Sequence, residues 1–375
     1  MSPIDRMPRA NRILLVLPSL ERGGGERVML QLARSFLAAG REVHLAVLQG
    51  GGPLRGEVPD TAVLHELIPA GHARGFALAW QVFPGLVSLM RGMQPDAVLS
   101  TMTGTNLLTT LACMRARTGS RLVLREASSL INARGFFKRA AMRWLYRRAD
   151  MVVAVSRGVA EDLRALSVPN GRLRVIHNPL DRERVRKLAA LGSIPPELEQ
   201  ASYVIALGRL TEAKDYPTLL RAYADSQLHH SHRLVIVGDG EERAKLEAIA
   251  RQLGVTAHVL FSGALANPYR VLAGAALLVL SSRWEGYPNA LLEALALGVP
   301  VVATDCRHGP RELLEGGRHG RLVPVGNPRA LARAMADECG RPANPAEEVI
   351  AAHDAGFVAS RYLDVLDGVP PELAA

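Results

Sequence analysis

SSRWEGYPNALLEALALGVPVVATD, residues 281–305, is the stretch of this 375-residue chain that decides its fold. Pro288 suits the first turn of a helix and Gly298 suits its end, and the leucines between them recur at helical spacing. We therefore predict a helix from about Pro288 to Leu297, between a strand that ends near Ser281 and a second short strand. A helix that starts directly after a strand points its unpaired N–H groups toward the edge where open parallel sheets bind ligands.

The same alternation of short apolar strands and amphipathic helices extends along the whole chain. We predict strands at 12–18, 43–48, 97–100, 121–125, 151–155, 203–207, 233–237, 258–261, 276–280 and 300–303. Alternating strands and helices form parallel sheets covered by helices. Because a charged, proline-containing stretch at 181–196 separates two series, we predict two doubly wound α/β domains. They span 1–185 and 186–345, and a C-terminal helix within 346–375 packs back toward the first domain.

Composition supports two hydrophobic cores and excludes several classes of protein. Hydrophobic residues make up 48% of the chain, and no apolar run approaches the roughly 20 residues that cross a bilayer. The first apolar stretch ends at Pro18 without a small-residue cleavage site, so we expect no signal peptide. Cys113, Cys306 and Cys339 lie far apart, which fits reduced thiols rather than a disulfide framework or a zinc site. We expect a cytoplasmic protein.

Positive charge is concentrated in the first half of the chain. Up to Val185 there are 26 basic and 14 acidic residues, and after it 19 and 22, so the net charge of +9 comes entirely from the first half. Such asymmetry indicates a polyanionic partner for one half only, either nucleic acid or an anionic membrane face.

A basic aromatic segment, RGFFKRAAMRWLYRR at residues 134–148, contributes six of these positive charges and no negative one. On a helix, its apolar stripe would consist of Phe137, Ala140, Ala141, Trp144 and Leu145, flanked by Arg139, Arg143 and Arg147. This is the composition of a helix that lies on anionic lipid, here the inner face of the plasma membrane. An ordinary amphipathic helix with its aromatic residues packed on the sheet explains the segment equally well, so both interpretations stay open.

Two carboxylates bracket the start of the helix predicted from Pro288. A carboxylate accepts two hydrogen bonds from hydroxyls, so Glu293 suits a ribose diol and Glu285 suits the hydroxyls of a sugar. A glutamate near a helix start is more often a partner of the helix dipole, but the glycine and proline between these two favour a ligand site.

Basic and glycine residues follow two other predicted strands. Arg209 and Lys214, five residues apart after the first strand of the second domain, can converge on a diphosphate. The glycines at 23–25 follow the first strand of the chain and open a helix, where bare N–H groups can approach a phosphate or a sugar. The spacing is not G-x-G-x-x-G and no acidic residue ends the strand at 43–48, which argues against a dinucleotide site.

The segment from Glu285 to Glu293 resembles the paired-glutamate motif of glycosyltransferase family 4 (glycosyl transferases group 1), which comprises retaining enzymes of the GT-B fold. The resemblance covers almost the whole chain. It includes GGGERV at 23–28, AVSRGVAEDL at 154–163, VIHNPLD at 175–181, ALGRLTEAKDYPTLLRAY at 206–223, VGDGEER at 237–243 and HGRLVPVGN at 319–327. It implies two facing Rossmann-like domains with an interdomain cleft, the first on the acceptor side and the second binding the nucleotide sugar.

The resemblance also implies roles for individual residues. Glu285, Arg209 and Lys214 are the expected catalytic residues, and the donor is expected to contact Gly24, Gly25, Gly238, Gly286, Tyr287, Pro288, Asn289 and Glu293. Many relatives carry a histidine in the first domain where this chain has LVLREASS at 122–129, so we assign only Arg125 and Glu126, on the acceptor or sugar side. A D-x-D pair is absent from the sequence, and we expect no metal and no cofactor because the nucleotide sugar is a substrate.

The resemblance implies transfer, with retention, of a hexose or N-acetylhexosamine from a nucleotide sugar, taken to be UDP-linked. The acceptor would be a saccharide or lipid-linked saccharide, in polysaccharide or glycoconjugate synthesis at the cell envelope. Two alternatives stay open. One is a sugar-nucleotide epimerase of the same fold, and the other is a noncatalytic protein that binds membrane or nucleic acid through its basic half. Nucleic acid is not expected as a partner, because no helix-turn-helix or RNA-binding signature is present in the sequence.

Overall fold

The computed structural model describes residues 9–69, 71, 75–130, 136–344 and 346–370, and these form two compact units. The first unit consists of Met1–Pro179 with His353–Ala375, and the second of Leu180–Ala352. The chain therefore passes to the second unit at Pro179, six residues before the boundary drawn from the sequence. The reason is the helix α6 (Arg182–Ala190), which packs on α9 (Tyr269–Ala273) of the second unit.

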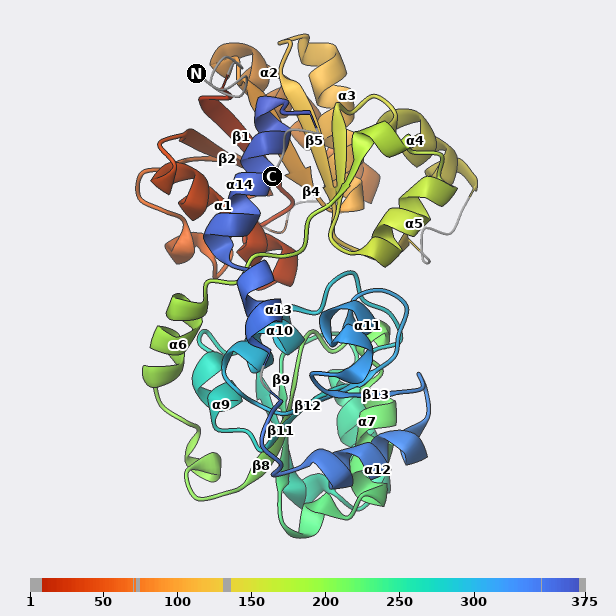
Figure 1. The fold of residues 1–375 in the computed structure, drawn as a ribbon. Coiled ribbons are helices and arrows are strands. Elements are labelled where there is room, and N and C mark those ends of the chain that lie inside the picture. Colours follow the sequence, from red (N-terminus) through yellow and green to blue (C-terminus); the bar gives the residue numbers. More distant parts are fainter. Residues whose placement is uncertain (1–8, 70, 72–74, 131–135, 345, 371–375) are drawn as a thin grey trace. The chain divides into compact units, whose positions relative to one another are not determined.

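The first unit is a seven-stranded parallel sheet with helices packed on it (Figure 1). Its strands lie in the order β3-β2-β1-β4-β5-β6-β7. They are β1 (Arg12–Leu17), β2 (Glu42–Gln49), β3 (Val63–Ile68), β4 (Ala97–Thr101), β5 (Arg121–Glu126), β6 (Met151–Ala154) and β7 (Leu173–Val175). Its helices are α1 (Gly24–Ala38), α2 (Gly75–Met93), α3 (Thr103–Ala116), α4 (Phe136–Tyr146), α5 (Arg157–Ala165) and α14 (Ala355–Asp367).

The second unit repeats this architecture around a six-stranded parallel sheet in the order β10-β9-β8-β11-β12-β13 (Figure 1). Its strands are β8 (Tyr203–Leu207), β9 (Arg233–Val237), β10 (Val259–Gly263), β11 (Leu277–Leu280), β12 (Val301–Thr304) and β13 (Arg321–Val323). Besides α6 and α9, its helices are α7 (Tyr216–Asp225), α8 (Arg243–Gln252), α10 (Asn289–Ala296), α11 (Pro310–Leu313), α12 (Pro328–Glu338) and α13 (Glu347–Ala352).

The C-terminal segment forms two helices, α13 and α14, where its sequence predicts one. The break falls at Asp354, whose carboxylate caps α14 by accepting a hydrogen bond from the Phe357 N–H at 3.0 Å. The helix α14 packs on α1, and its buried Tyr362 belongs to the core of the first unit. At its end, Asp367 forms an ion pair of 2.7 Å with Arg41. These contacts make α14 an integral part of the first unit.

Each sheet contains one point where the strand order reverses direction along the chain. In the first unit this switch point lies between β1 and β4, and in the second between β8 and β11. The loops that leave neighbouring strands there diverge to opposite faces of the sheet, which opens a crevice at the carboxyl ends of the strands. Ligand sites are therefore expected after β1 and β4, and after β8 and β11.

Candidate functional site

An ion pair occupies the switch point of the second unit. Lys214 lies in the loop after β8 and Glu285 in the loop after β11, and the lysine Nζ is 2.6 Å from the Glu285 Oε1. The Ser282 hydroxyl donates to the same carboxylate oxygen at 2.6 Å. The two charged side chains are 20% and 12% exposed, so they are mostly shielded but open to solvent on one side. Two predicted site residues that lie 71 positions apart in sequence are thus in direct contact.

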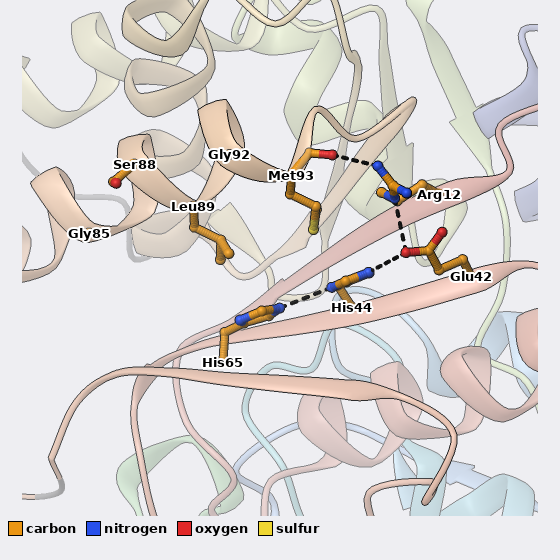
Figure 2. A pocket seen from close by; sticks show the side chains of 9 residues that line it. All are labelled: Arg12, Glu42, His44, His65, Gly85, Ser88, Leu89, Gly92 and Met93. Carbon is orange, nitrogen blue, oxygen red and sulfur yellow. Dashed lines mark hydrogen bonds and ion pairs between the residues drawn. The ribbon is translucent and has the colours of Figure 1, made fainter.

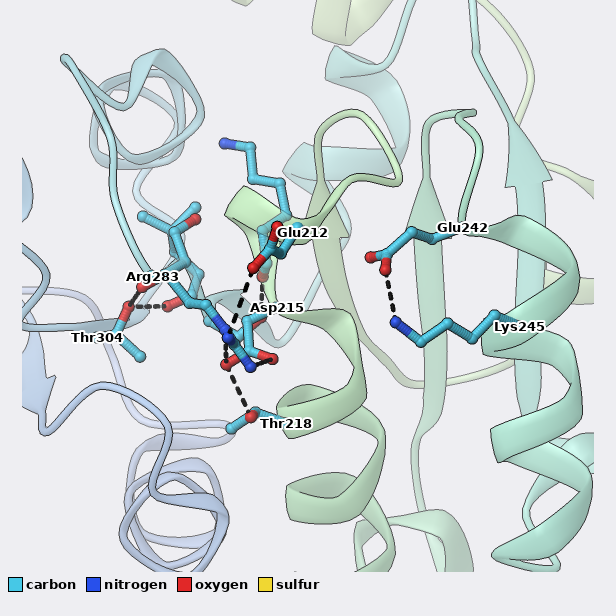
Figure 3. A network of polar contacts seen from close by, with 11 residues as sticks. Glu212, Asp215, Thr218, Glu242, Lys245, Arg283 and Thr304 are labelled. Carbon is cyan, nitrogen blue, oxygen red and sulfur yellow. Dashed lines mark hydrogen bonds and ion pairs between the residues drawn. The ribbon is translucent and has the colours of Figure 1, made fainter. Parts of the chain in front are cut away.

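A network of polar contacts holds the loop that carries Lys214 (Figure 3). The Ser281 hydroxyl donates to the Lys214 carbonyl at 2.7 Å, and the Arg283 N–H donates to the Ala213 carbonyl at 2.8 Å. The Arg283 guanidinium lies 3.2 Å from the carboxylate of Asp215, which is buried and also accepts from the Thr218 hydroxyl (Figure 3). The lysine is therefore anchored to the strand end that carries its partner glutamate.

Two glycines allow close packing after β8 and β9, and the first of them makes room for the lysine side chain. Gly208 has φ +149°, and a Cβ atom there would lie 2.8 Å from the Lys214 Cε. Gly238 has φ +146°, and a Cβ atom there would lie 2.0 Å from the Gly208 carbonyl oxygen. Gly238 is predicted to contact the donor, but it also has a packing role. Only glycine fits at this position, because the ends of β8 and β9 approach each other closely. Gly208 was not singled out from the sequence, although it lies in the motif ALGRL.

Arg209 differs from Lys214 in its surroundings. Its side chain is exposed and forms no hydrogen bond or ion pair with any residue that the structure describes. A guanidinium in this state can turn toward an anionic ligand without first leaving a protein partner. The structure therefore places two cations after β8, one paired with a carboxylate and one exposed to solvent.

The loop that leads into α10 is buried against a neighbouring loop. The helix starts at Asn289, one residue later than predicted, and ends before Gly298, which has the left-handed φ of +71°. Gly286, Tyr287 and Pro288 are all buried. Gly309 supports this loop, since a Cβ atom there would lie 2.5 Å from the Pro288 Cδ. The Tyr287 ring therefore has a packing role, and burial raises its pKa well above the usual value.

Glu293 lies in the second turn of α10 and is half-buried. Its Oε1 accepts a hydrogen bond from the Tyr269 hydroxyl on α9 at 3.1 Å, which orients the carboxylate (Figure 1 shows α9 and α10). Tyr269 was not predicted as a site residue, because the surrounding NPYR carries no recognisable ligand motif. Among the described residues, no cluster of three or more His, Cys, Asp or Glu side chains is placed to hold a metal ion.

The glycine turn of the first unit is already covered by a carboxylate of the chain. Gly23 is the N-cap of α1, and a Cβ atom there would lie 1.9 Å from the Glu26 Oε2. Glu26 is 6% exposed, so its carboxylate folds back over the positive end of the helix. This arrangement opposes a phosphate at Gly24 and Gly25. Of the two ligands considered from the sequence, an uncharged sugar is the better fit.

Arg125 and Glu126 require a correction, because both are fully buried rather than placed along an open surface. The Arg125 guanidinium donates to the Thr101 hydroxyl at 2.8 Å and to the side-chain oxygen of Asn178 at 2.5 Å. The Glu126 carboxylate accepts from the hydroxyls of Thr103 and Tyr146. Burial raises the pKa of Glu126, and the hydrogen bond from Tyr146 opposes that rise. Both side chains are therefore used in hydrogen bonds inside the first unit.

A separate polar cluster lines a pocket at the amino ends of the first strands (Figure 2). The His44 Nδ1 lies 3.0 Å from the His65 Nε2, and the His44 Nε2 lies 2.8 Å from the Glu42 Oε1. The Arg12 guanidinium lies 2.9 Å from the same Glu42 oxygen, and α2 covers the opposite side (Figure 2). This chain of contacts joins β1, β2 and β3 at the edge opposite the switch point.

The first unit should lose stability when the pH falls below about 6.5, the usual pKa of histidine. Burial, and then the neighbouring His44, lower the pKa of His65, so below pH 6.5 the unfolded chain binds a proton that the folded chain excludes. The pKa of Glu42 is also lowered, by His44 and Arg12, but its contribution is lost only below about pH 4.3. No titratable side chain of α2 lines the pocket within the described residues.

We therefore expect the melting temperature to fall between pH 7.5 and 5.5, and His65→Gln to flatten that fall while keeping a donor for His44. His229 and His232 of the second unit also have lowered pKa values, so the slope should decrease without vanishing. Thermal unfolding at several pH values measures it. An unchanged slope in the variant would show that His65 does not titrate as described.

Comparison with known proteins gives matches along both halves of the chain. The family described as Glycosyltransferase Family 4 matches residues 22–184, and Glycosyl transferases group 1 matches residues 194–338. A Campylobacter jejuni enzyme, N-acetylgalactosamine-N,N'-diacetylbacillosaminyl-diphospho-undecaprenol 4-alpha-N-acetylgalactosaminyltransferase, is 28% identical over 84% of this chain and 87% of its own. The lipopolysaccharide core biosynthesis glycosyltransferase LpsE of Rhizobium meliloti is 29% identical over 84% of each chain.

Solved structures confirm the fold. Anabaena HepE in complex with UDP-glucose superposes with a TM-score of 0.72 and 20% identity, covering 96% of this chain and 98% of its own. Neither the epimerase nor the noncatalytic alternative is favoured by these matches. With two parallel α/β units of the GT-B type and a family match on each half, the chain belongs to the family 4, group 1 glycosyltransferases.

Proposed function

We propose that this glycosyltransferase transfers a hexose or N-acetylhexosamine from a UDP-sugar to a saccharide or lipid-linked saccharide, with retention at the anomeric carbon, in lipopolysaccharide or glycoconjugate synthesis. The contact of 2.6 Å between Lys214 and Glu285 at a switch point carries the proposal. It joins a cation suited to a diphosphate and a carboxylate suited to sugar hydroxyls. The UDP-glucose bound by HepE and the lipid-linked acceptor named for the Campylobacter relative support the choice of substrates.

Catalysis would rest on stabilisation of the leaving group. As the bond from the anomeric carbon to the diphosphate breaks, negative charge grows on the diphosphate, and Lys214 and Arg209 stabilise it. Glu285 would hold hydroxyls of the transferred sugar, and Glu293, oriented by Tyr269, would hold the ribose. The acceptor hydroxyl attacks on the face from which the diphosphate departs, and its proton leaves with the diphosphate. In this proposal the nucleotide sugar is a substrate, and no metal or cofactor is required.

The test is a panel of nucleotide sugars incubated with the purified protein. A UDP-sugar donor should raise the melting temperature through preferential binding to the folded state and should be hydrolysed slowly without acceptor. NMR of the released sugar, recorded before mutarotation, should show the α-anomer from an α-linked donor. Absence of UDP binding would remove the donor assignment, and an epimerised nucleotide sugar in place of free sugar would favour the epimerase.

We further propose that the first unit binds anionic membranes through α4. The structure corrects the apolar stripe predicted for this helix, because α4 buries Met142, Leu145 and Tyr146. Trp144 instead faces solvent at 49% exposure, with the Arg148 guanidinium 3.5 Å from its ring centroid. Exposed basic side chains surround it, namely Lys138, Arg139, Arg143 and Arg147. Phe137 lies outside the side chains that the structure describes. No helix among the described residues is long and apolar enough to span a bilayer.

Replacing Arg139, Arg143 and Arg147 together by glutamate should abolish binding to vesicles that contain phosphatidylglycerol. Each basic residue near an anionic surface contributes about 1 kcal/mol, and exposed charges are screened within about 10 Å at 0.1 M salt. Wild-type binding in a co-sedimentation assay should therefore also weaken in high salt. The matched control is the triple glutamate variant at Arg329, Arg333 and Arg341, exposed arginines of the second unit. Equal sedimentation of all three proteins would contradict the proposal.

A further inference from the structure

Met102 adopts a backbone conformation that is unusual for a residue with a side chain. It joins β4 to α3 with φ +73° and ψ +138°, outside the regions that L-residues normally occupy. Such strain persists only where the surrounding structure enforces it, and it concentrates at functional positions. Met102 lies at the carboxyl end of β4, which is one side of the switch point in the first unit.

Buried polar groups hold Met102 in this conformation from both sides. Its N–H donates to the Arg125 carbonyl at 3.3 Å, and its carbonyl accepts from the Asn106 N–H at 2.9 Å. The Asn106 side-chain amide also donates to the Arg125 carbonyl, at 3.0 Å. The next residue, Thr103, is fixed by the Glu126 carboxylate, with both oxygens at 3.1 Å from its hydroxyl. The interior roles found for Arg125 and Glu126 thus include support of Met102.

The Met102 side chain is directed toward the glycine turn on the other side of the switch point. A Cβ atom on Gly25 would lie 3.8 Å from the Met102 Sδ and 3.9 Å from its Cγ. These are ordinary contact distances, and Gly25 has no left-handed φ, so the fold would accept alanine there. The bare backbone of Gly25 instead leaves a surface open beside a half-buried thioether.

We propose that Met102 is a specificity-determining residue that contacts the acceptor saccharide, an inference that rests on the proposed glycosyl transfer. The two switch points differ in chemistry. Lys214 and Arg209 at the second suit a diphosphate, whereas the first presents a thioether, bare glycine backbone and the Glu26 carboxylate over the start of α1. A carboxylate repels a diphosphate but accepts hydroxyls, and a thioether packs on the C–H face of a sugar ring. The first switch point therefore suits an uncharged saccharide.

The test compares Met102→Gly, Met102→Leu and wild type, with p-nitrophenyl glycosides as acceptor probes and a UDP-sugar that wild type hydrolyses. Met102→Gly should lower kcat/KM for the glycoside about tenfold, while donor KM and hydrolysis by water stay within about twofold. Met102→Leu, which keeps an apolar side chain, should recover most of the loss. The control is Arg117→Gly at the other end of α3, where an exposed arginine has φ +57°. Both glycine variants should melt no lower than wild type, because glycine relieves the strain.

A second readout does not require turnover. In protein labelled with methyl-13C methionine, the signal that disappears in Met102→Leu should shift when the glycoside is added and not when UDP is added alone. A shift with UDP alone, or equal kinetics for wild type and Met102→Gly, would overturn the assignment of Met102. Failure of the proposed function would show differently, as wild type that neither binds UDP nor hydrolyses a UDP-sugar.

Discussion

Replacing Lys214 by methionine should lower kcat for sugar transfer and for donor hydrolysis by about 10²–10³-fold, the effect of removing one preorganised group that stabilises charge in a transition state. The affinity for UDP should fall much less, because the negative charge on the diphosphate increases most as the bond to the sugar breaks. Steady-state kinetics alongside calorimetric titration with UDP separates the two effects.

The matched control for this variant is Lys245→Met. Lys245 pairs with Glu242 at 2.6 Å in the same unit (Figure 3), but its side chain is 59% exposed and it belongs to α8, whereas the switch point lies between β8 and β11. Exposed pairs of this kind contribute little to stability, so this variant should fold as wild type does. It should also retain wild-type kinetics, because Lys245 has no role in the proposed transfer. If Lys214→Met instead lost UDP affinity while kcat at saturation survived, the lysine would bind the ground state and the transition state equally.

Glu285→Gln should lower kcat by about 10- to 150-fold, which corresponds to the loss of a charge-assisted hydrogen bond of about 1.5–3 kcal/mol. The amide keeps the shape of the carboxylate, but it cannot accept from sugar hydroxyls with the same strength. Glu293→Gln should mainly raise the donor KM, since its assigned ligand is the ribose, which does not react. Wild-type kinetics in both variants would contradict the assignment of the two glutamates.

The double variant Lys214→Met with Glu285→Gln tests whether the contact seen in the structure matters for function. The two groups are 2.6 Å apart, so their effects on kcat should be clearly non-additive. Each single variant leaves a partly shielded charge without its partner, whereas the double variant removes both charges. Additive losses would show that the two residues act independently during turnover.

Most of the fold could be predicted from the sequence, because apolar strands and amphipathic helices alternate with clear periods. Three strands were missed, all of them at sheet edges. β3 has no fully buried residue, and β7 and β13 are only three residues long. The break between α13 and α14 was missed because of the capping residue, Asp354. In sequence, an aspartate within a helical pattern looks the same whether it caps a helix or lies on its polar face.

In the candidate site, the sequence places Lys214 and Glu285 after the carboxyl ends of two strands, and the two side chains are in contact in the structure. The roles assigned to Lys214, Glu285 and Glu293 stay predictions. Arg125 and Glu126 were misassigned because they also end a strand. Their burial depends on Asn178, which is 53 residues from Arg125, and on Tyr146, which is 20 residues from Glu126. Nothing local in the sequence indicates these partners.

The sequence alone determined the family, the two parallel sheets and the residue types at the ends of their strands, since each depends on local patterns of polarity, glycine and proline. Only the tertiary structure decided which of those residues meet. The pairing of Lys214 with Glu285 and the place of the strained Met102 beside Gly25 both depend on strand order. Strand order places residues from distant parts of the chain side by side, because the buried apolar faces of all the strands must pack together at once.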